Sequence, residues 1–137
     1  ARGLITGLTR GTTAAHLARA TIEGIALQIV DLVSAMVQDS GKTLGRLRVD
    51  GGAARNDLLM EFQAGVLGAP VDRPASVETT ALGAAYLAGL AVGMFSDLGA
   101  VISAHKIEKT FEPQMSQERR SELHEAWNNA IRRARSE

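Results

Sequence analysis

The chain has 137 residues and carries 15 basic and 15 acidic side chains, so its formal net charge is zero. This balance excludes the concentrated basic field that binding to nucleic acids or anionic membranes requires, and we expect neither partner. No cysteine is present, which excludes disulfides and thiolate chemistry and favours a reducing cytoplasm as the location.

The length suits one domain or part of one, and hydrophobic residues make up 45% of the chain, which is ample for a core. The longest apolar run, residues 81–95, is shorter than the ~20 residues that a membrane-spanning helix needs. We therefore expect no membrane span. The first residue is Ala1 rather than an initiator Met, which leads us to expect a segment of a longer protein.

The first expected elements are a short strand and a long helix. Residues 3–8 read as a strand, and Thr12 or Thr13 then caps a helix that runs to about Gln38. Gly41 follows this helix and supplies a stop signal.

Apolar residues recur at helical spacing along one stripe of this long helix. The members of the stripe are Ala18, Ile22, Ile25, Ile29, Leu32 and Met36. Leu17, Leu27 and Val30 lie away from the stripe, so we expect the helix to contact protein on more than one side.

A strand over residues 44–49 leads to the paired glycines Gly51 and Gly52, and a helix follows over residues 56–67. Gly68 is expected to end that helix. The residues predicted to face the core from it are Leu58, Leu59, Phe62 and Val66.

The next expected elements are a short strand and a helix rich in small residues. Residues 70–74 have a proline at each end, which predicts a strand at the margin of a sheet. Thr79 or Thr80 is expected to cap a helix over residues 81–92, whose small side chains allow close packing.

Residues 96–113 have weak periodicity and read as a loop with a short helical turn. A final amphipathic helix is expected over residues 116–135, with Leu123, Trp127, Ile131 and Ala134 facing inward. Strands separated by helices predict an α/β fold. The chain supplies only about three strands, fewer than the roughly five to six of an average sheet, so the sheet is expected to be incomplete.

The paired glycines are the strongest candidate site. Glycine accepts backbone angles closed to other residues and leaves no β-carbon in the way of a ligand. The helix that follows directs unpaired N–H groups toward the turn, which suits a nucleotide. Asn56 offers both a donor and an acceptor for a ribose or purine edge. An ordinary strand-to-helix turn with a helix-capping Asn56 explains the same local pattern.

Other catalytic signatures are missing. His16, His105 and His124 are scattered, without the spacing of a metal site, and a structural or surface role is expected for each. The sequence contains no Gly-x-Ser-x-Gly elbow, no Gly-x-Gly-x-x-Gly fingerprint and no Walker loop. Rossmann-type dinucleotide binding and P-loop chemistry are therefore unsupported.

Several motifs together resemble one family. They are residues 1–3 (ARG), 7–11 (GLTRG), 47–53 (LRVDGGA) and 80–93 (TALGAAYLAGLAVG). In this order and spacing they closely resemble the C-terminal part of the FGGY carbohydrate kinases, and within that family the glycerol kinase branch. The resemblance implies an actin-like ATPase (ribonuclease-H-like) fold. It places residues 1–137 in the nucleotide-binding C-terminal domain, with 114–137 as a terminal helix.

The resemblance also implies site residues. Gly51 and Gly52 form the turn of the family's adenosine motif, Gly52 and Asn56 match positions that contact the adenosine of ATP, and Ala53 lines the same pocket. Thr80 and Gly83 match a motif that packs beside the nucleotide cleft. Arg55 stands where the family often has a small residue, so the rim of the pocket is expected to differ.

The implied function is ATP-dependent phosphorylation of glycerol to sn-glycerol 3-phosphate. Phosphoryl transfer needs a carboxylate for the substrate hydroxyl, a phosphate-cradling loop and Mg²⁺. In the family these groups and the glycerol pocket come from the part before Ala1, so we expect no catalytic or metal-binding residue here and no activity from this segment alone. Two alternatives remain: a portion of another FGGY sugar kinase, and a non-catalytic actin-like interaction module.

A truncated domain would leave an unpaired strand edge at residues 3–8, and exposed edges recruit other chains. We therefore expect either a homo-oligomer formed through this edge or a remnant of a longer protein.

Overall fold

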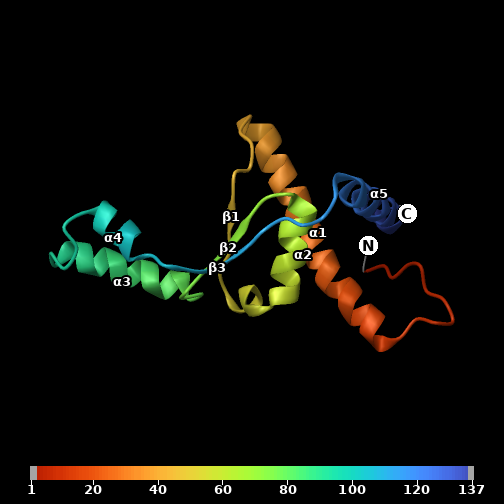
Figure 1. Ribbon diagram of the computed structural model, residues 1–137, viewed down its shortest axis with the longest axis horizontal. Helices are drawn as coiled ribbons and strands as arrows, with labels where there is room; N and C mark the ends of the chain where they lie inside the picture. Colours follow the sequence, from red (N-terminus) through yellow and green to blue (C-terminus); the bar gives the residue numbers. More distant parts are fainter. Residues whose placement is uncertain (1–2, 136–137) are drawn as a thin grey trace.

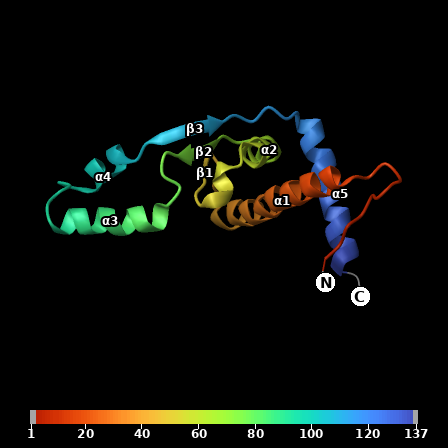
Figure 2. The ribbon, with the colours of Figure 1, turned by 90° about the horizontal axis from the view of Figure 1, so that it is seen from below.

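The computed structural model describes residues 3–135. Its helices are α1 (Ala14–Ser40), α2 (Asp57–Leu67), α3 (Thr79–Ala91), α4 (Leu98–Ala104) and α5 (Gln117–Arg135), with a 3₁₀ turn, η1, at Gly52–Arg55. The strands are β1 (Leu47–Arg48), β2 (Val71–Pro74) and β3 (Ile107–Phe111). α2 packs against α1, α5 and the sheet, whereas α3 and α4 project to one end of the molecule (Figures 1 and 2).

The three strands lie in the order β1-β2-β3, with β1 parallel to β2 and β2 antiparallel to β3. The prediction that the proline-bounded strand lies at the sheet margin was wrong, because β2 is central. Pro70 precedes the strand and Pro74 is its last residue, so neither interrupts its centre. The Pro70 carbonyl accepts from the Leu47 N–H at 2.9 Å, and Pro74 lies at an irregularity in the pairing with β3.

Two further strand predictions need correction. Residues 3–8 form no strand and run as an irregular segment, so self-association through a strand edge there loses its basis. Residues 96–113, expected to be a loop with a short helical turn, contain the seven-residue helix α4 and also β3, which was not expected. The alternation in β3 is too weak to identify a strand locally, and the strand is defined by its pairing with β2.

The helix boundaries follow the sequence signals closely. Gly41 and Gly68 both adopt the left-handed conformation at helix C-termini, with φ of 66° and 68°. Their N–H groups donate to Val37 O and Ala64 O, each at 2.9 Å, as C-terminal capping requires. α3 differs, because it begins at Thr79 and no threonine hydroxyl caps it.

The face of α1 that reaches the core is not the predicted stripe. Ala26, Leu27 and Val30 are buried, whereas Leu32 and Met36 are 57% and 60% exposed. The buried face contacts α2, whose Gln63 Nε2 donates to Ala26 O at 3.3 Å. Several faces of an apolar helix satisfy the same periodicity, so the position of α2 decides which one is buried.

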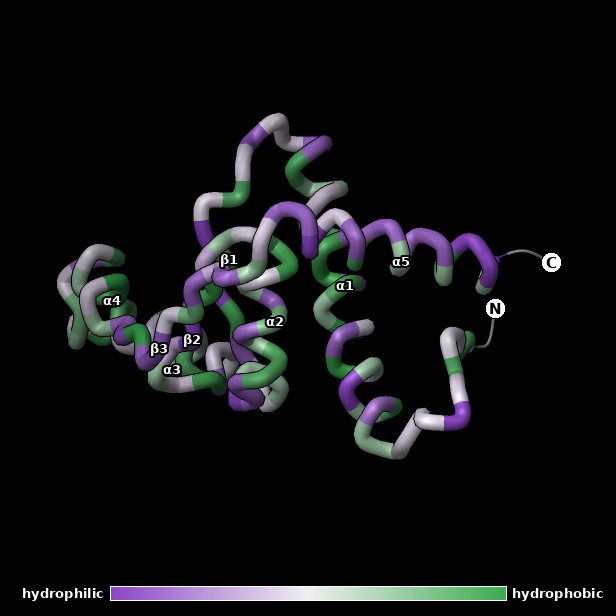
Figure 3. The backbone as a smooth tube through the Cα atoms, turned by 45° about the vertical axis from the view of Figure 1, so that its right-hand side comes forward, coloured by the Kyte–Doolittle hydropathy of each residue, from purple (hydrophilic) through white to green (hydrophobic). Residues whose placement is uncertain are grey.

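The core lies around α2 and β2. Leu59, Phe62 and Val66 are buried as predicted, whereas Leu58 is 39% exposed and was wrongly assigned to the core. From α5, which is largely hydrophilic in Figure 3, Leu123 and Trp127 pack against this core. The Trp127 Nε1–H donates to Asp31 Oδ2 at 2.7 Å and so joins α5 to α1.

α1 also has the length and apolar composition of a membrane span, which the sequence analysis missed because Glu23 and Asp31 interrupt its apolar runs. It is the one such helix among residues 3–135. A single helix of this kind is weak evidence, since the core helix of a folded domain passes the same test. The expectation of no membrane span stays a prediction.

Candidate functional site: the glycine turn between β1 and α2

The turn after β1 is open on one side. Gly51 has φ of 76°, in the left-handed region, and its N–H donates to Val77 O at 2.9 Å. A β-carbon placed on Gly51 or Gly52 would meet no other atom within 4 Å. The Ala54 N–H donates to Gly51 O at 3.1 Å, which closes the tight bend. The glycines therefore present bare backbone to open space, as close approach of a flat ligand requires.

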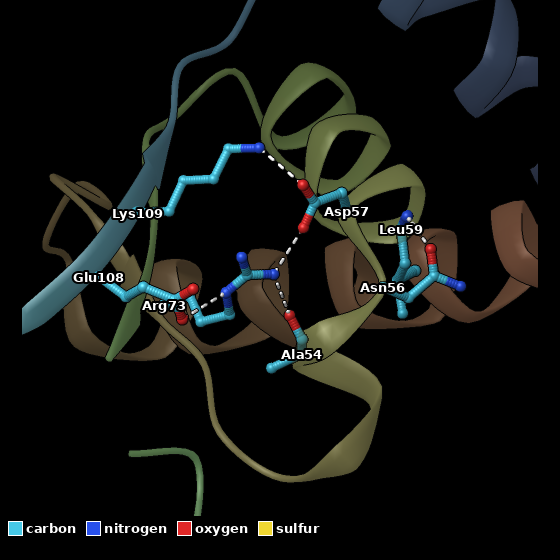
Figure 4. A network of polar contacts seen from close by, with 7 residues as sticks. All are labelled: Ala54, Asn56, Asp57, Leu59, Arg73, Glu108 and Lys109. Carbon is cyan, nitrogen blue, oxygen red and sulfur yellow. Dashed lines mark hydrogen bonds and ion pairs between the residues drawn. The ribbon is translucent and has the colours of Figure 1, made fainter. Parts of the chain in front are cut away.

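Asn56 connects this turn to α2 and caps the helix. Its Oδ1 accepts from the Leu59 N–H at 3.2 Å, and its own backbone N–H donates to Ala53 O at 3.1 Å. Because the oxygen faces the helix, the side-chain nitrogen points outward (Figure 4). The helix-capping interpretation is thus correct for the oxygen, and the exposed nitrogen remains available to donate to a ligand.

The predicted site residues lie together. Gly51, Gly52, Ala53 and Asn56 follow one another along a single turn, where Gly52, Ala53 and Asn56 are exposed and Gly51 is half-buried. Arg55 is exposed in the same turn. Thr80 and Gly83 lie on α3, and open space surrounds Gly83.

A contact just before the turn connects it to α3. The Thr79 hydroxyl donates to Asp50 Oδ2, which joins the end of β1 to the first residue of α3. Asp50 and Thr79 also line a cavity of about 470 Å³ between the sheet and the α3–α4 arm. Its wall includes Asp72, Tyr86 and His105 but none of residues 51–56, so the predicted site lies beside this cavity and not within it.

A buried arginine behind the turn was missed by sequence reasoning. Arg73 on β2 is only 7% exposed. Its Nη1 donates to Ala54 O at 3.0 Å and to Asp57 Oδ1 at 2.6 Å, and its Nε donates to Glu108 Oε2 at 3.2 Å (Figure 4). The only local signal was a charged residue in a strand bounded by prolines, and that does not predict partners from three other segments.

Asp57, the first residue of α2, has two cationic partners. Lys109 Nζ donates to its Oδ2 at 2.7 Å, on the side opposite to Arg73. The hydrogen bonds from Lys109 and from Arg73 lower the pKa of the Asp57 carboxyl. The negative charge is therefore retained at the N-terminus of α2, where it also interacts favourably with the helix dipole.

Asp72 is a buried carboxylate whose hydrogen-bond partners connect elements of the fold. It accepts from Arg46 Nη1 at 2.5 Å and from the Thr110 hydroxyl at 2.7 Å. The hydrogen bond from Arg46 is the main cause of its lowered pKa, which burial opposes. These contacts join the segment before β1 to β2 and β3.

Within residues 3–135, no group of three or more His, Cys, Asp or Glu side chains gathers closely enough to hold a metal ion. His16 instead lies at the start of α1, where its Nδ1 accepts from the Thr13 N–H at 3.1 Å.

Comparison with known proteins identifies the family. The C-terminal domain of the FGGY family of carbohydrate kinases matches residues 1–92. The chain is 56% identical to a glycerol kinase of Dechloromonas aromatica over 134 residues and 58% identical to glycerol kinase 1 of Clostridium tetani over 134 residues. Each alignment covers 98% of this chain and 27% of the relative, so the chain spans about a quarter of the length of the curated relatives it matches.

Solved structures agree on the fold. The crystal structure of Plasmodium falciparum glycerol kinase with ADP matches with a TM-score of 0.87 and 33% identity, covering 96% of this chain and 26% of that one. A ligand-bound xylulose kinase from Lactobacillus acidophilus matches with a TM-score of 0.79 and 26% identity, covering 98% and 27%. The predicted actin-like α/β fold with a small sheet is confirmed. The chain belongs to the FGGY family of carbohydrate kinases.

Proposed function

We propose that this chain is the C-terminal, ATP-binding portion of a glycerol kinase, which phosphorylates glycerol to sn-glycerol 3-phosphate with ATP. The observation that carries the proposal is 52–58% identity to glycerol kinases over 98–99% of the chain. Xylulose and gluconate kinase structures share the fold at only 25–28% identity. The absence of cysteine supports the reducing cytoplasm as the location.

In this proposal the glycine turn binds the adenosine of ATP or ADP. Gly51 and Gly52 offer flat backbone for the nucleoside, and Ala53 adds a small apolar surface beside it. Asn56 donates from its outward nitrogen to an acceptor on the ribose or purine, while its oxygen stays on the Leu59 N–H.

The phosphoryl-transfer chemistry is assigned to residues outside this chain. Most of its aspartates have structural partners: Asp31 accepts from Trp127, Asp50 from Thr79, and Asp97 from the Ala100 N–H. Asp57 and Asp72 form ion pairs with arginine and lysine side chains. These partners support an assignment of the proton acceptor and of the Mg²⁺ ligands, which this transfer requires, to other residues of the full-length protein.

The test uses the full-length protein that contains this chain. We expect ATP-dependent phosphorylation of glycerol in preference to xylulose or gluconate, measured as ADP release with each acceptor. Phosphorylation of a sugar with no turnover of glycerol would support another FGGY kinase. ADP binding without turnover of any acceptor would support the non-catalytic module.

The proposed role of Asn56 in nucleotide binding can be tested separately from its role as the cap of α2. In Asn56→Ser and Asn56→Asp the side-chain oxygen continues to cap α2, since both residues are good N-caps. Both lose the amide donor, so ADP affinity measured by calorimetry should fall about fivefold to tenfold with little change in melting temperature. Asn128→Ser, at an exposed position on α5, is the matched control. Unchanged ADP affinity in both Asn56 variants would contradict the assignment.

A further inference from the structure

The residues on both sides of Asn56 are held by one buried side chain, that of Arg73. Arg73 Nη1 donates to Ala54 O, two residues before Asn56, and to Asp57 Oδ1, one residue after it (Figure 4). Asn56 itself is held by its backbone N–H, which donates to Ala53 O, by its carbonyl, which accepts from the Met60 N–H, and by its cap on the Leu59 N–H. Its orientation therefore depends on the two segments that Arg73 connects.

The position of Arg73 is itself closely constrained. Its guanidinium carbon lies 5.2 Å from the centroid of the Phe111 ring, and Lys109 Nζ lies 4.4 Å from the same centroid. Glu108 accepts from Nε, and Lys109 holds the second oxygen of Asp57. A planar guanidinium supplies donors in a rigid fork, so a single side chain bridges η1, α2 and β3 at once.

Burial strengthens these contacts. The Arg73 side chain is 8% exposed, whereas Asp57 and Glu108 are 48% and 53% exposed. A buried guanidinium keeps its hydrogen bonds because an unpaired donor there has a high desolvation cost. The shape of the turn is consequently supported by a buried residue of the central strand, through its bonds to Ala54 O and Asp57 Oδ1.

We propose that Arg73 is a positioning residue for the nucleotide. It holds Gly52–Arg55 and the first turn of α2 so that the glycine backbone and the Asn56 nitrogen face the same ligand. This inference rests on the proposed function of the turn, and it adds a residue that acts through Ala54 and Asp57 without touching the nucleotide.

The test measures ADP affinity and steady-state kinetics of the full-length protein with Arg73→Gln and Arg73→Lys. We expect Arg73→Gln to raise the ADP dissociation constant and the KM for ATP about tenfold, since a charge-assisted hydrogen bond no longer holds the turn. The KM for glycerol should stay within about twofold, because that pocket lies outside this chain. Arg73→Lys keeps the charge but not the fork, so its values should lie between those of the wild type and Arg73→Gln.

Arg46→Gln is the matched control. Arg46 makes an ion pair with Asp72, which lies on the same strand as Arg73. Arg46 contacts none of residues 51–57. It should lower the melting temperature without changing the KM for ATP. Glu108→Gln, which removes the negative charge of a half-exposed partner of Arg73 and leaves both contacts to the turn, should change the KM for ATP less than Arg73→Gln does.

A drop in melting temperature for Arg73→Gln with unchanged ADP affinity and unchanged KM for ATP would overturn the inference and leave Arg73 as a structural residue. If Arg73→Gln does not fold, the same criterion applies to Arg73→Lys against Arg46→Lys. A wild-type protein that binds ADP but phosphorylates a different acceptor overturns the proposed substrate, while the ADP affinities still decide the role of Arg73. A wild-type protein that does not bind ADP overturns both proposals.

Discussion

Two charged residues, Asp72 and Arg73, lie buried in a segment for which the sequence predicted only a short strand. Asp72 and Arg73 are adjacent on the central strand and both are buried. Their partners, Arg46 and Thr110 for Asp72 and Asp57 and Glu108 for Arg73, come from segments far away in the sequence. The two side chains thus connect the sheet to the segment before β1 and to the start of α2.

The partners of Asp72 predict a pH dependence of stability. Its pKa is lowered in the folded state from an ordinary value of 3.8, mainly by Arg46. The stabilisation is therefore fully present above about pH 4 and is lost as the pH falls through the lowered folded value. Asp72→Asn should reduce the free energy of unfolding by about 1–3 kcal/mol at pH 7, and the difference from the wild type should shrink toward pH 2.

Urea unfolding followed by circular dichroism at pH 7 and at pH 2–3 measures this difference. Asp39→Asn, at an exposed position near the end of α1, serves as the control and should change neither curve. A deficit in Asp72→Asn that stays constant over the whole pH range would show that the lowered pKa is not the source of the stabilisation.

The elements of the fold are bounded by local signals that act within a few residues. Gly41 and Gly68 end α1 and α2 in the same left-handed conformation, and Asn56 begins α2 through its cap. These signals place the glycine turn and the start of α2 at a defined spacing along the chain. The local geometry of the candidate site therefore depends on these glycines and on the Asn56 cap.

Gly68→Ala and Gly24→Ala should have opposite effects on stability. Gly68 has φ of 68°, and an added β-carbon would collide with the Arg120 guanidinium, so Gly68→Ala should destabilise by about 1–2 kcal/mol. Gly24 lies inside α1, where a β-carbon would lie 3.9 Å from Trp127 Cζ3, an ordinary contact. Gly24→Ala should therefore stabilise by up to about 1 kcal/mol. Thermal unfolding of both variants checks the signs, and equal shifts in one direction would contradict the argument.

At the scale of the whole molecule, the described chain has one core and one projecting arm. The core lies around α2, whereas α3 and α4 project from the sheet with Leu87, Val92 and Ile102 69–77% exposed (Figure 1). The Arg133 guanidinium donates to Thr6 Oγ1 at 3.3 Å, so the segment before α1 lies beside α5.

The 137-residue chain expressed alone should show no glycerol phosphorylation and only weak ADP binding, because the contacts to the triphosphate and the polyol are assigned elsewhere. A coupled ADP-release assay and calorimetry at millimolar ADP measure the two quantities. The full-length protein under the same conditions is the positive control. Robust turnover by the chain alone would place the catalytic groups within it and contradict the assignment.

The amino-acid sequence by itself determined the glycine stops of α1 and α2, the glycine turn and the capping Asn56, because each of these depends on residue types at short spacing. It also determined the family, through several motifs spread over residues 1–93. Only the tertiary structure decided which face of α1 is buried, that residues 107–111 pair as a strand, and that β2 is central. It also brought Arg73 to Ala54 and Asp57, and Asp72 to Arg46. These features depend on contacts between segments that are distant in the sequence. Periodicity and spacing within one segment do not specify which other segment packs against it.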